Sequence, residues 1–271
     1  MTAPEREAGT EEMWRAMLLG TDPIYARNRR RFKHLPSSPR CKMCNAPFAG
    51  PGALLLQLIG RRRWAKNGKY CGQCFTTLQT HHGGAEIDCS LLFADVRGST
   101  SLAERMRPAE FSRLLQRFYG VATEVLTEED AIVDKFVGDE VVAIFIPALT
   151  GDAHARRAVD AARALLRATG HEEPGGPWIP VGAGVTTGVA YVGAVGSGDQ
   201  PEITALGDVV NTAARLASAA GPGELLVTLP AARFGGVAPD DHEQRTLHLK
   251  GKAEPVEVLV VSSRAELAAA V

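Results

Sequence analysis

The chain has 271 residues, 45% of them hydrophobic and 23% charged, which is typical of a globular protein with one large and one small domain. No apolar run approaches the roughly 18 to 20 residues of a membrane span. The acidic first segment also lacks the apolar core of a secretory signal. We therefore expect a cytoplasmic protein without a transmembrane segment.

The net charge of −1 hides an uneven distribution. Residues 23–85 contain 12 Lys and Arg but no Asp or Glu, which leaves 18 basic and 31 acidic residues elsewhere. The basic region could meet nucleic acid, an anionic membrane surface or an acidic protein patch. Aromatic residues among its charges are sparse and no nucleic-acid motif is complete, so we favour an intramolecular contact or a protein partner over nucleic acid.

The first predicted elements are a helix and a basic arm. Apolar residues in "TEEMWRAMLLG" (residues 10–20) recur at helical spacing and stop at Gly20, which predicts a helix. The basic stretch "YARNRRRFKHLPSSPR" (residues 25–40) ends in Pro and Ser, which favours a linker or arm. We assign residues 1–40 to this helix and basic arm.

A cysteine module is predicted at residues 41–80. Two Cys-x-x-Cys pairs, Cys41 with Cys44 and Cys71 with Cys74, stand 26 residues apart, and four thiolates could close a tetrahedral site. In a cytosolic protein such pairs indicate metal before disulfide. Zn²⁺ is favoured because it stabilises modules too small for a core of their own. An iron–sulfur cluster acting as a redox sensor, a redox dithiol and a metal-free module remain alternatives.

Beyond residue 86, strands and helices follow one another regularly. The predicted order is strand, helix, strand pair, helix and strand, at residues 87–95, 111–126, 132–145, 152–168 and 178–196. A further helix and strand are expected at 206–228, and the tail from Arg245 predicts a closing hairpin. This order favours an α+β sandwich with helices over one face of a sheet.

Two carboxylates of this region lie where predicted strands end. Asp95 closes "LLFAD", and Asp139 follows Gly138 in the turn of "IVDKFVGDEVVAIF". Such carboxylates beside glycine-containing loops can hold Mg²⁺, which prefers oxygen ligands. The "VRGST" segment after Asp95 (residues 96–100) offers backbone N–H groups to phosphate oxygens.

Four segments resemble, in order, the successive motifs of class III adenylate and guanylate cyclases: "LLFADVRGSTSLAERM", "DKFVGDEVVAIF", "GDVVNTAARL" and "LKGKAEP". The resemblance covers about residues 86–262. It implies the ferredoxin-like α+β catalytic fold of that family over residues 86–264. The small zinc-ribbon-like module with four cysteine ligands before it is predicted from the cysteine spacing. The resemblance also implies a homodimer whose active sites lie between two head-to-tail subunits.

The resemblance implies a role for each matching residue. Asp95 and Asp139 match the aspartates that hold two Mg²⁺ or Mn²⁺ ions per active site, with the backbone carbonyl of Val96 as a further ligand. Asn211 and Arg215 share one face of a predicted helix. They match the catalytic pair that orients the ribose and stabilises phosphate charge in the transition state.

Substrate contacts follow in the same way. Lys250 matches the lysine that contacts the terminal phosphates, with Lys252 an open alternative, and Thr100 belongs to the phosphate-binding "VRGST" segment. Lys135 stands where adenylate cyclases of this class have a lysine that donates to adenine N1, and lysine cannot accept from guanine N1–H. Thr204 occupies the partner position, where a hydroxyl discriminates less sharply than the Asp of many relatives.

The sequence thus favours an adenylate cyclase that converts ATP to 3′,5′-cyclic AMP and pyrophosphate and is regulated by its cysteine module. A guanylate cyclase and a catalytically inactive nucleotide- or nucleic-acid-binding regulator are the alternatives. In a head-to-tail dimer, Lys135 would face the base in one site while Asp139 holds metal in the other. Cys89, within a predicted core strand, is expected to be an inert buried thiol.

Overall fold

The computed structural model describes residues 3–35, 39–65, 68, 70–80, 82–196 and 202–262. The chain divides into two compact units: Met1–Ile87 with Tyr191–Ala205, and Asp88–Ala190 with Leu206–Val271. The predicted limits at residues 1 and 264, and residues 36–38 of the predicted arm, lie outside the described residues. No helix within the described ranges is long and apolar enough to cross a membrane.

The first unit begins with a helix, as predicted. Helix α1 (Ala3–Leu19) starts before the expected segment and buries Trp14, Met17 and Leu18. These positions lie on one helical face, so the apolar spacing in the sequence reflects packing against the rest of this unit.

The basic stretch predicted as an arm is instead largely helical, which corrects the interpretation as a linker. Helix α2 (Pro23–Lys33) starts where the Asp22 carboxylate accepts from the backbone N–H groups of Ile24 and Tyr25, at 3.0 and 2.9 Å. Proline at the first helical position and cations in the last turn also favour a helix here. Phe32 is buried and stabilises the helix by packing, whereas the prediction of an arm rested on the charged residues and on the Pro and Ser at the end of the stretch.

Two short helices complete the described part of the cysteine module. Helix α3 (Gly50–Leu58) buries Ala53 and Leu56, and helix α4 (Gly72–Thr80) starts between the cysteines of the second pair. The backbone joins residues 62–64 to residues 70–72: Trp64 N–H donates to the Tyr70 carbonyl at 2.9 Å, and Gly72 N–H to the Arg62 carbonyl at 3.0 Å. The second cysteine pair therefore sits on a small hydrogen-bonded turn.

Three strand segments also belong to the first unit. They are the start of β1 (Gly83–Val96), the end of β4 (Val181–Val195) and the short strand β5 (Glu202–Leu206), which pairs with β4. A side chain on Gly84 would lie only 2.5 Å from the Val192 carbonyl oxygen, so β1 and β4 approach closely at this end. Strand β5, which no sequence pattern had indicated, carries Thr204.

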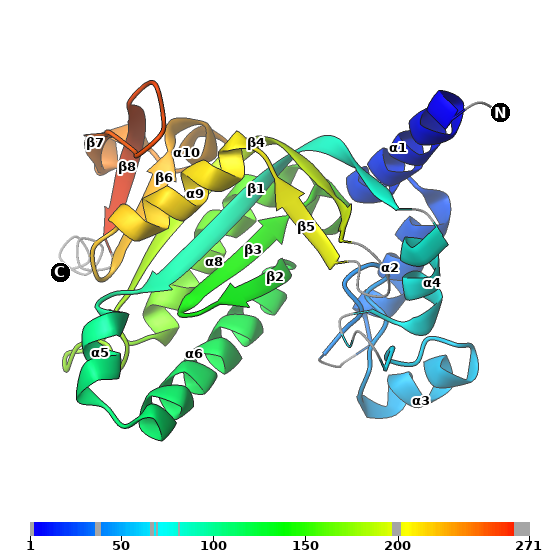
Figure 1. Ribbon diagram of the computed structural model, residues 1–271, viewed down its shortest axis with the longest axis horizontal. Coiled ribbons are helices and arrows are strands. Elements are labelled where there is room, and N and C mark those ends of the chain that lie inside the picture. The colour runs from blue at the N-terminus through cyan, green and yellow to red at the C-terminus, as the bar shows by residue number, and fades with distance from the viewer. Residues whose placement is uncertain are drawn as a thin grey trace. The chain divides into compact units, whose positions relative to one another are not determined.

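The second unit contains most of the sheet (Figure 1). Strand order is β2-β3-β1-β4-β6-β8-β7. The remaining strands are β2 (Ile132–Val137), β3 (Glu140–Phe145), β6 (Glu224–Thr228), β7 (Glu243–Leu247) and β8 (Val256–Ser262). β4 and β6 run parallel, whereas β3 pairs antiparallel with β1 and β2, and β8 with β6 and β7. The predicted strands are confirmed, including the closing hairpin.

One face of the sheet carries the main core. Helices α6 (Pro108–Glu128), α8 (His154–Ala168) and α10 (Leu229–Gly235) lie there. Phe118, Leu126 and Leu165 from these helices pack with Val185 and Val227 from the sheet. Alternate strand residues point to this face, which is why β4 contributes every second side chain to it.

The opposite face is covered by helix α9 (Asp208–Ala219), whereas the sequence had suggested helices on one face only. Leu216 of α9 packs with Leu226, Val258 and Val260. A side chain on Gly184 of β4 would lie 2.6 Å from the backbone nitrogen of Ala217. The glycines of β4 therefore allow α9 to lie almost directly on the strand, a close approach that the sequence pattern did not reveal.

Short elements connect these layers. They are α5 (Ser99–Arg105), α7 (Pro147–Thr150) and the 3₁₀ turns Gly151–Ala153 and Pro239–Asp241.

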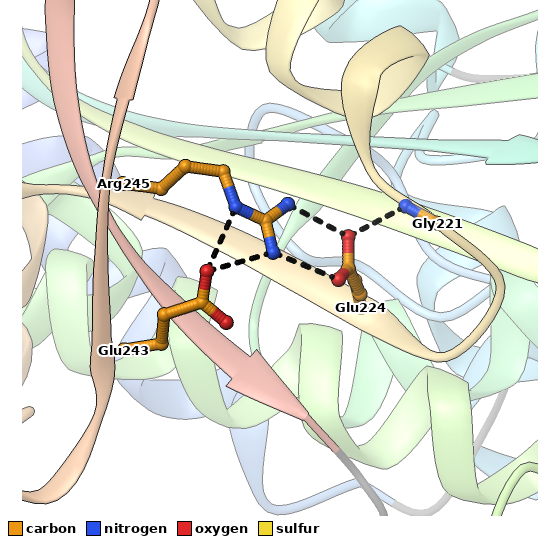
Figure 2. A network of polar contacts seen from close by, with 4 residues as sticks. All are labelled: Gly221, Glu224, Glu243 and Arg245. Carbon is orange, nitrogen blue, oxygen red and sulfur yellow. Dashed lines mark hydrogen bonds and ion pairs between the residues drawn. The ribbon is translucent and has the colours of Figure 1, made fainter.

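A polar network ties β6 to β7 (Figure 2). The guanidinium group of Arg245 donates to both carboxylate oxygens of Glu224, at 3.2 and 3.3 Å, and to Glu243 at 3.1 Å. Glu224 also accepts from the Gly221 N–H at 2.8 Å. Although burial raises the pKa of Glu224, the hydrogen bonds from Gly221 and Arg245 bring it below its ordinary value. The fork geometry fixes the turn after α9 against the strands.

Candidate active site

Asp95 and Asp139 lie at one corner of the sheet. Asp95 stands opposite Glu140 in the β1–β3 pairing, and Val96 N–H donates to the Asp139 carbonyl at 3.3 Å. Gly138 adopts a positive φ of 61° in the β2–β3 turn, a conformation that side chains disfavour. The end of β1 and this tight turn therefore bring the two predicted metal-binding residues together.

Arg97, which the sequence analysis did not single out, holds this corner in place. Its guanidinium group forms an ion pair with the Asp95 carboxylate and donates to the Ser218 carbonyl at 2.8 Å, while its backbone N–H donates to the Pro180 carbonyl at 2.8 Å. The segment after β1 is thus anchored to the end of α9 and the start of β4. The sequence could have indicated this ion pair, because Arg97 follows Asp95 by two residues at the end of a predicted strand.

The corner carries an excess of negative charge. Burial, and secondarily the charge of Asp139, raises the pKa of Glu140 to about 7. The same two causes raise the pKa of Tyr119, whose hydroxyl donates to the Gly138 carbonyl. Neighbouring carboxylates repel one another when all are ionised. A divalent cation that prefers oxygen ligands would relieve this repulsion.

Thr100 lies just beyond this corner. Gly98 turns the chain with a φ of 69°, and helix α5 starts at Ser99. Thr100 is exposed in the first turn of α5.

The second group of predicted residues gathers around α9 and the β7–β8 loop. Asn211 is exposed and Arg215 is half-buried, one helical turn apart. A side chain on Gly251 would lie 3.2 Å from Nη2 of Arg215, so the loop backbone passes directly beside the guanidinium group. Arg215 Nη1 is buried and has no hydrogen-bond partner among the described residues. A buried, unpaired guanidinium nitrogen is well placed to receive an anion.

The two candidate lysines differ in their surroundings. Lys252 forms an ion pair with Asp208 at the start of α9, whereas Lys250 is exposed. A cavity of about 620 Å³ next to this pair is lined in part by Asp208, Lys252 and Thr187. It does not include Asp95, Asp139, Asn211 or Arg215, so the cavity does not coincide with the predicted catalytic residues.

Lys135 lies in the middle of β2, where the pairing with β3 shifts register between Val133 and Lys135. Its Nζ lies 3.3 Å from a carboxylate oxygen of Asp134, which is almost fully buried. The lysine side chain is partly exposed and forms an ion pair with this carboxylate.

The four cysteines of the first unit form one buried cluster. Their sulfur atoms all lie within 4.8 Å of one another, and no disulfide joins them. Cys44 Sγ lies 3.8 Å from Cys71 Sγ, and the Cys71 N–H donates to Cys41 Sγ at 3.3 Å. Zn–S bonds of about 2.3 Å in a tetrahedron place sulfurs about 3.8 Å apart, so the cluster fits a tetrahedral metal ion. The predicted cysteine cluster is therefore present.

Two arginines surround this cluster. Arg29 is buried and donates to the carbonyl groups of Met43 at 2.9 Å and Met17 at 3.4 Å. Burial lowers the pKa of Arg29 from its ordinary value, although the charge of Cys44 opposes this change. For Arg61 burial also acts to lower the pKa, but the nearby cysteines raise it overall. A tetrathiolate zinc site has a net charge of about −2, which two guanidinium groups offset.

Comparisons with known proteins agree with this fold. The family model "Adenylate and Guanylate cyclase catalytic domain" matches residues 84–261. The adenylate cyclase of Anabaena cylindrica is 33% identical over 132 residues, which is 47% of this chain and 26% of the relative. The crystal structure of the guanylyl cyclase Cya2 aligns with a TM-score of 0.61 and 26% identity, over 66% of this chain and 93% of the other. The adenylyl cyclase CyaB from P. aeruginosa aligns with a TM-score of 0.57 and 27% identity, over 66% and 96%.

The chain belongs to the adenylate and guanylate cyclase catalytic domain family, because the family model covers most of its length. The predicted family and α+β fold are thereby confirmed. The chain spans about a third of the length of the Mycobacterium tuberculosis proteins that it also matches. The relatives named above include cyclases of both nucleotide specificities.

Proposed function

We propose that this chain is an adenylate cyclase that converts ATP to 3′,5′-cyclic AMP and pyrophosphate. The observation that carries the proposal is the buried Arg215 Nη1, unpaired among the described residues and held beside Gly251. A cyclase fold that had lost its activity would have no use for a buried guanidinium nitrogen without a hydrogen-bond partner. This feature favours an enzyme over a catalytically inactive regulator.

Asp95 and Asp139, with the Val96 carbonyl, are the residues that would hold Mg²⁺ or Mn²⁺. When bound, the ions lower the pKa of the ribose 3′-hydroxyl and neutralise charge on the triphosphate. Arg97 aligns the Asp95 carboxylate, and the turn at Gly138 positions Asp139. Burial raises the pKa of Glu140, and the charge of Asp139, which such ions would balance, raises it further.

The remaining residues would bind and orient the nucleotide. Asn211, exposed on α9, can donate to the ribose, and Arg215 can donate to the phosphate that is attacked. Lys250, exposed in the β7–β8 loop, is the better candidate for the terminal phosphates because Lys252 is already paired with Asp208. We therefore propose Lys250 rather than Lys252 for this role.

ATP is favoured over GTP by Lys135. Lysine donates hydrogen bonds and suits adenine N1, whereas guanine N1–H also donates. Lys135 lies at the irregular part of the β2 pairing and forms an ion pair with Asp134. Guanylate cyclase activity is the second candidate, because the Thr204 hydroxyl can either donate or accept and Cya2 is a guanylyl cyclase.

We further propose that the enzyme is a homodimer with sites between subunits and that the cysteine cluster holds Zn²⁺. In a site divided between two subunits, one subunit would supply Asp95 and Asp139 and the other Asn211 and Arg215.

The proposed function is tested by incubating the purified chain with Mn²⁺ and either ATP or GTP, with product analysis by chromatography. We expect cyclic AMP, at a rate several times that of cyclic GTP, and no product from Asp139→Asn. Cyclic GTP as the main product would support the second candidate. No product from either nucleotide would contradict both, and salt-dependent nucleic-acid binding would then support a regulator.

A further inference from the structure

Tyr70 connects the cysteine cluster to a distant strand. It directly precedes Cys71 and is fully buried. Its carbonyl accepts from Trp64 N–H at 2.9 Å, and the next residue pairs with Arg63 in an isolated bridge. The backbone of Tyr70 is therefore fixed by the same turn that presents Cys71 to the other three cysteines.

The side chain of Tyr70 reaches β5, 133 residues away in the sequence. The backbone N–H of Ile203 donates to the Tyr70 hydroxyl oxygen at 2.7 Å, in a buried environment. Both residues belong to the first unit, and β5 pairs with β4. A buried N–H that bonds to a side chain rather than to a neighbouring strand depends on that side chain.

Ile203 directly precedes Thr204, which the proposed function places against the base. Thr204 is buried, and its hydroxyl can accept from an adenine amino group or donate to a guanine carbonyl. Which of these it does depends on how β5 is placed. Hydrogen bonds weaken steeply when donor and acceptor move apart or lose alignment, so the contact with Tyr70 fixes β5 closely.

We propose that Tyr70 is a positioning residue for base selection, which couples occupancy of the cysteine cluster to the placement of Thr204. The proposal rests on the proposed function. Metal binding holds the four sulfurs together and with them Cys71, so Tyr70 keeps its position beside Ile203. Loss of the metal releases Cys71, and the adjacent Tyr70 moves with it. Strand β5 is then less firmly held, and Thr204 can bind either adenine or guanine. The N-terminal module would thus adjust substrate choice.

The first test measures amide hydrogen exchange in β5 of the full zinc-loaded chain by mass spectrometry. A chelator selective for zinc over magnesium should speed exchange at Glu202–Leu206 at least tenfold in the unsubstituted chain. In zinc-loaded Tyr70→Phe, exchange at β5 should be fast before the chelator is added, and the chelator should have little further effect. The zinc content of this variant should be unchanged. Tyr25→Phe, the same change elsewhere in this unit, should behave like the unsubstituted chain.

Three outcomes of this experiment overturn the proposal. The first is exchange at β5 that does not respond to chelation in the unsubstituted chain. The second is slow exchange in zinc-loaded Tyr70→Phe. The third is a general increase in exchange across all peptides of the variant, because that result indicates a merely structural role.

The second test measures binding of 3′-deoxy-ATP and 3′-deoxy-GTP, which lack the hydroxyl that cyclises. The preference for the adenine nucleotide should fall at least fivefold in Tyr70→Phe and remain unchanged in Tyr25→Phe. An unchanged preference in Tyr70→Phe overturns the proposal. Failure of the unsubstituted chain to cyclise either nucleotide would count against the proposed function alone, since this binding ratio does not depend on turnover.

Discussion

Arg215 combines a buried, unpaired nitrogen with a rigid neighbour, the backbone of Gly251, among the residues that the structure describes. Lysine at this position keeps a positive charge but loses the planar fork that can contact two phosphate oxygens. We therefore expect Arg215→Lys to lower kcat about a hundredfold with little change in KM, as when one donor to transition-state charge is removed. Steady-state kinetics with Mn²⁺-ATP would measure this, with Arg233→Lys at an exposed position of α10 as the control. A loss of less than a few-fold would contradict the assignment.

Lys250 and Lys252 can be separated by the same substitution at each position. Lys250→Met should raise KM for ATP about tenfold, because it would remove a charged contact made in both the ground and transition states. Lys252→Met should change KM less, because its main partner is Asp208. A larger KM effect at Lys252 would reverse the assignment.

His154 gives the fold a pH dependence. Burial lowers the pKa of His154, against the opposing charges of Asp88 and Asp152. Its Nδ1 lies 2.8 Å from Ser90 Oγ, which lies 2.6 Å from Thr187 Oγ1. The folded state therefore keeps this imidazole neutral where the unfolded state, with an ordinary pKa of about 6.5, binds a proton.

Because the unfolded state binds the extra proton, the free energy of unfolding should fall as the pH drops below about 6.5. Urea unfolding at pH 7.5 and 5.5 should show a smaller loss for His154→Gln than for the unsubstituted chain. An equal loss in both would show that His154 does not titrate as described.

At the scale of single residues, the sequence indicated candidate site residues but not the residues that contact them in the folded chain. Asp95, Asp139, Asn211 and Arg215 were predicted from their places in the family's motifs, and their roles stay predictions. The contact of Arg97 with the Ser218 carbonyl, and the position of Gly251 beside Arg215, join segments that lie far apart in the sequence. Such pairs depend on the folded backbone, which no local pattern encodes.

At the scale of elements, the packing of α9 on β4 is the most demanding contact. A methyl group on Gly184 would lie 2.6 Å from the backbone nitrogen of Ala217, whereas one on Gly188 would meet Val209 at an ordinary 3.6 Å. We expect Gly184→Ala to lower the free energy of unfolding by about 1–3 kcal/mol, because the backbone of α9 or β4 must shift to make room for the methyl group. Gly188→Ala in the same strand is the matched control and should change it by less than about 1 kcal/mol. Equal effects in urea unfolding would contradict the close approach.

Element prediction succeeded where periodicity was strong and failed where packing overrode composition. The α6, α8 and α9 helices and the main strands follow their apolar spacing. Helix α2 was missed because its charges suggested an arm, although Asp22 and Pro23 form a helix start. Strand β5 was missed because its pairing with β4 is a tertiary contact that no local pattern indicates.

At the scale of the whole molecule, the sequence predicted a basic region that contains a cluster of four cysteines. It could not show that Arg29 of α2 is buried near the cluster, because a buried arginine is rare and its hydrogen bonds to the Met43 and Met17 carbonyl groups are tertiary contacts. The proposed assembly divides the charged hairpin of β2 and β3 between two sites. Lys135 would serve the base in one site, and Asp139 the metal in the other.

The most direct test of this account is to mix Lys135→Ala and Asp139→Ala chains and measure cyclic AMP formation from ATP. Each variant alone should be nearly inactive. With free exchange of subunits, half of the dimers are mixed and one of their two sites is intact, so about a quarter of the unsubstituted activity should return. No recovery, although mixed dimers are shown to form by tagged co-purification, would contradict an adenylate cyclase with sites shared between subunits.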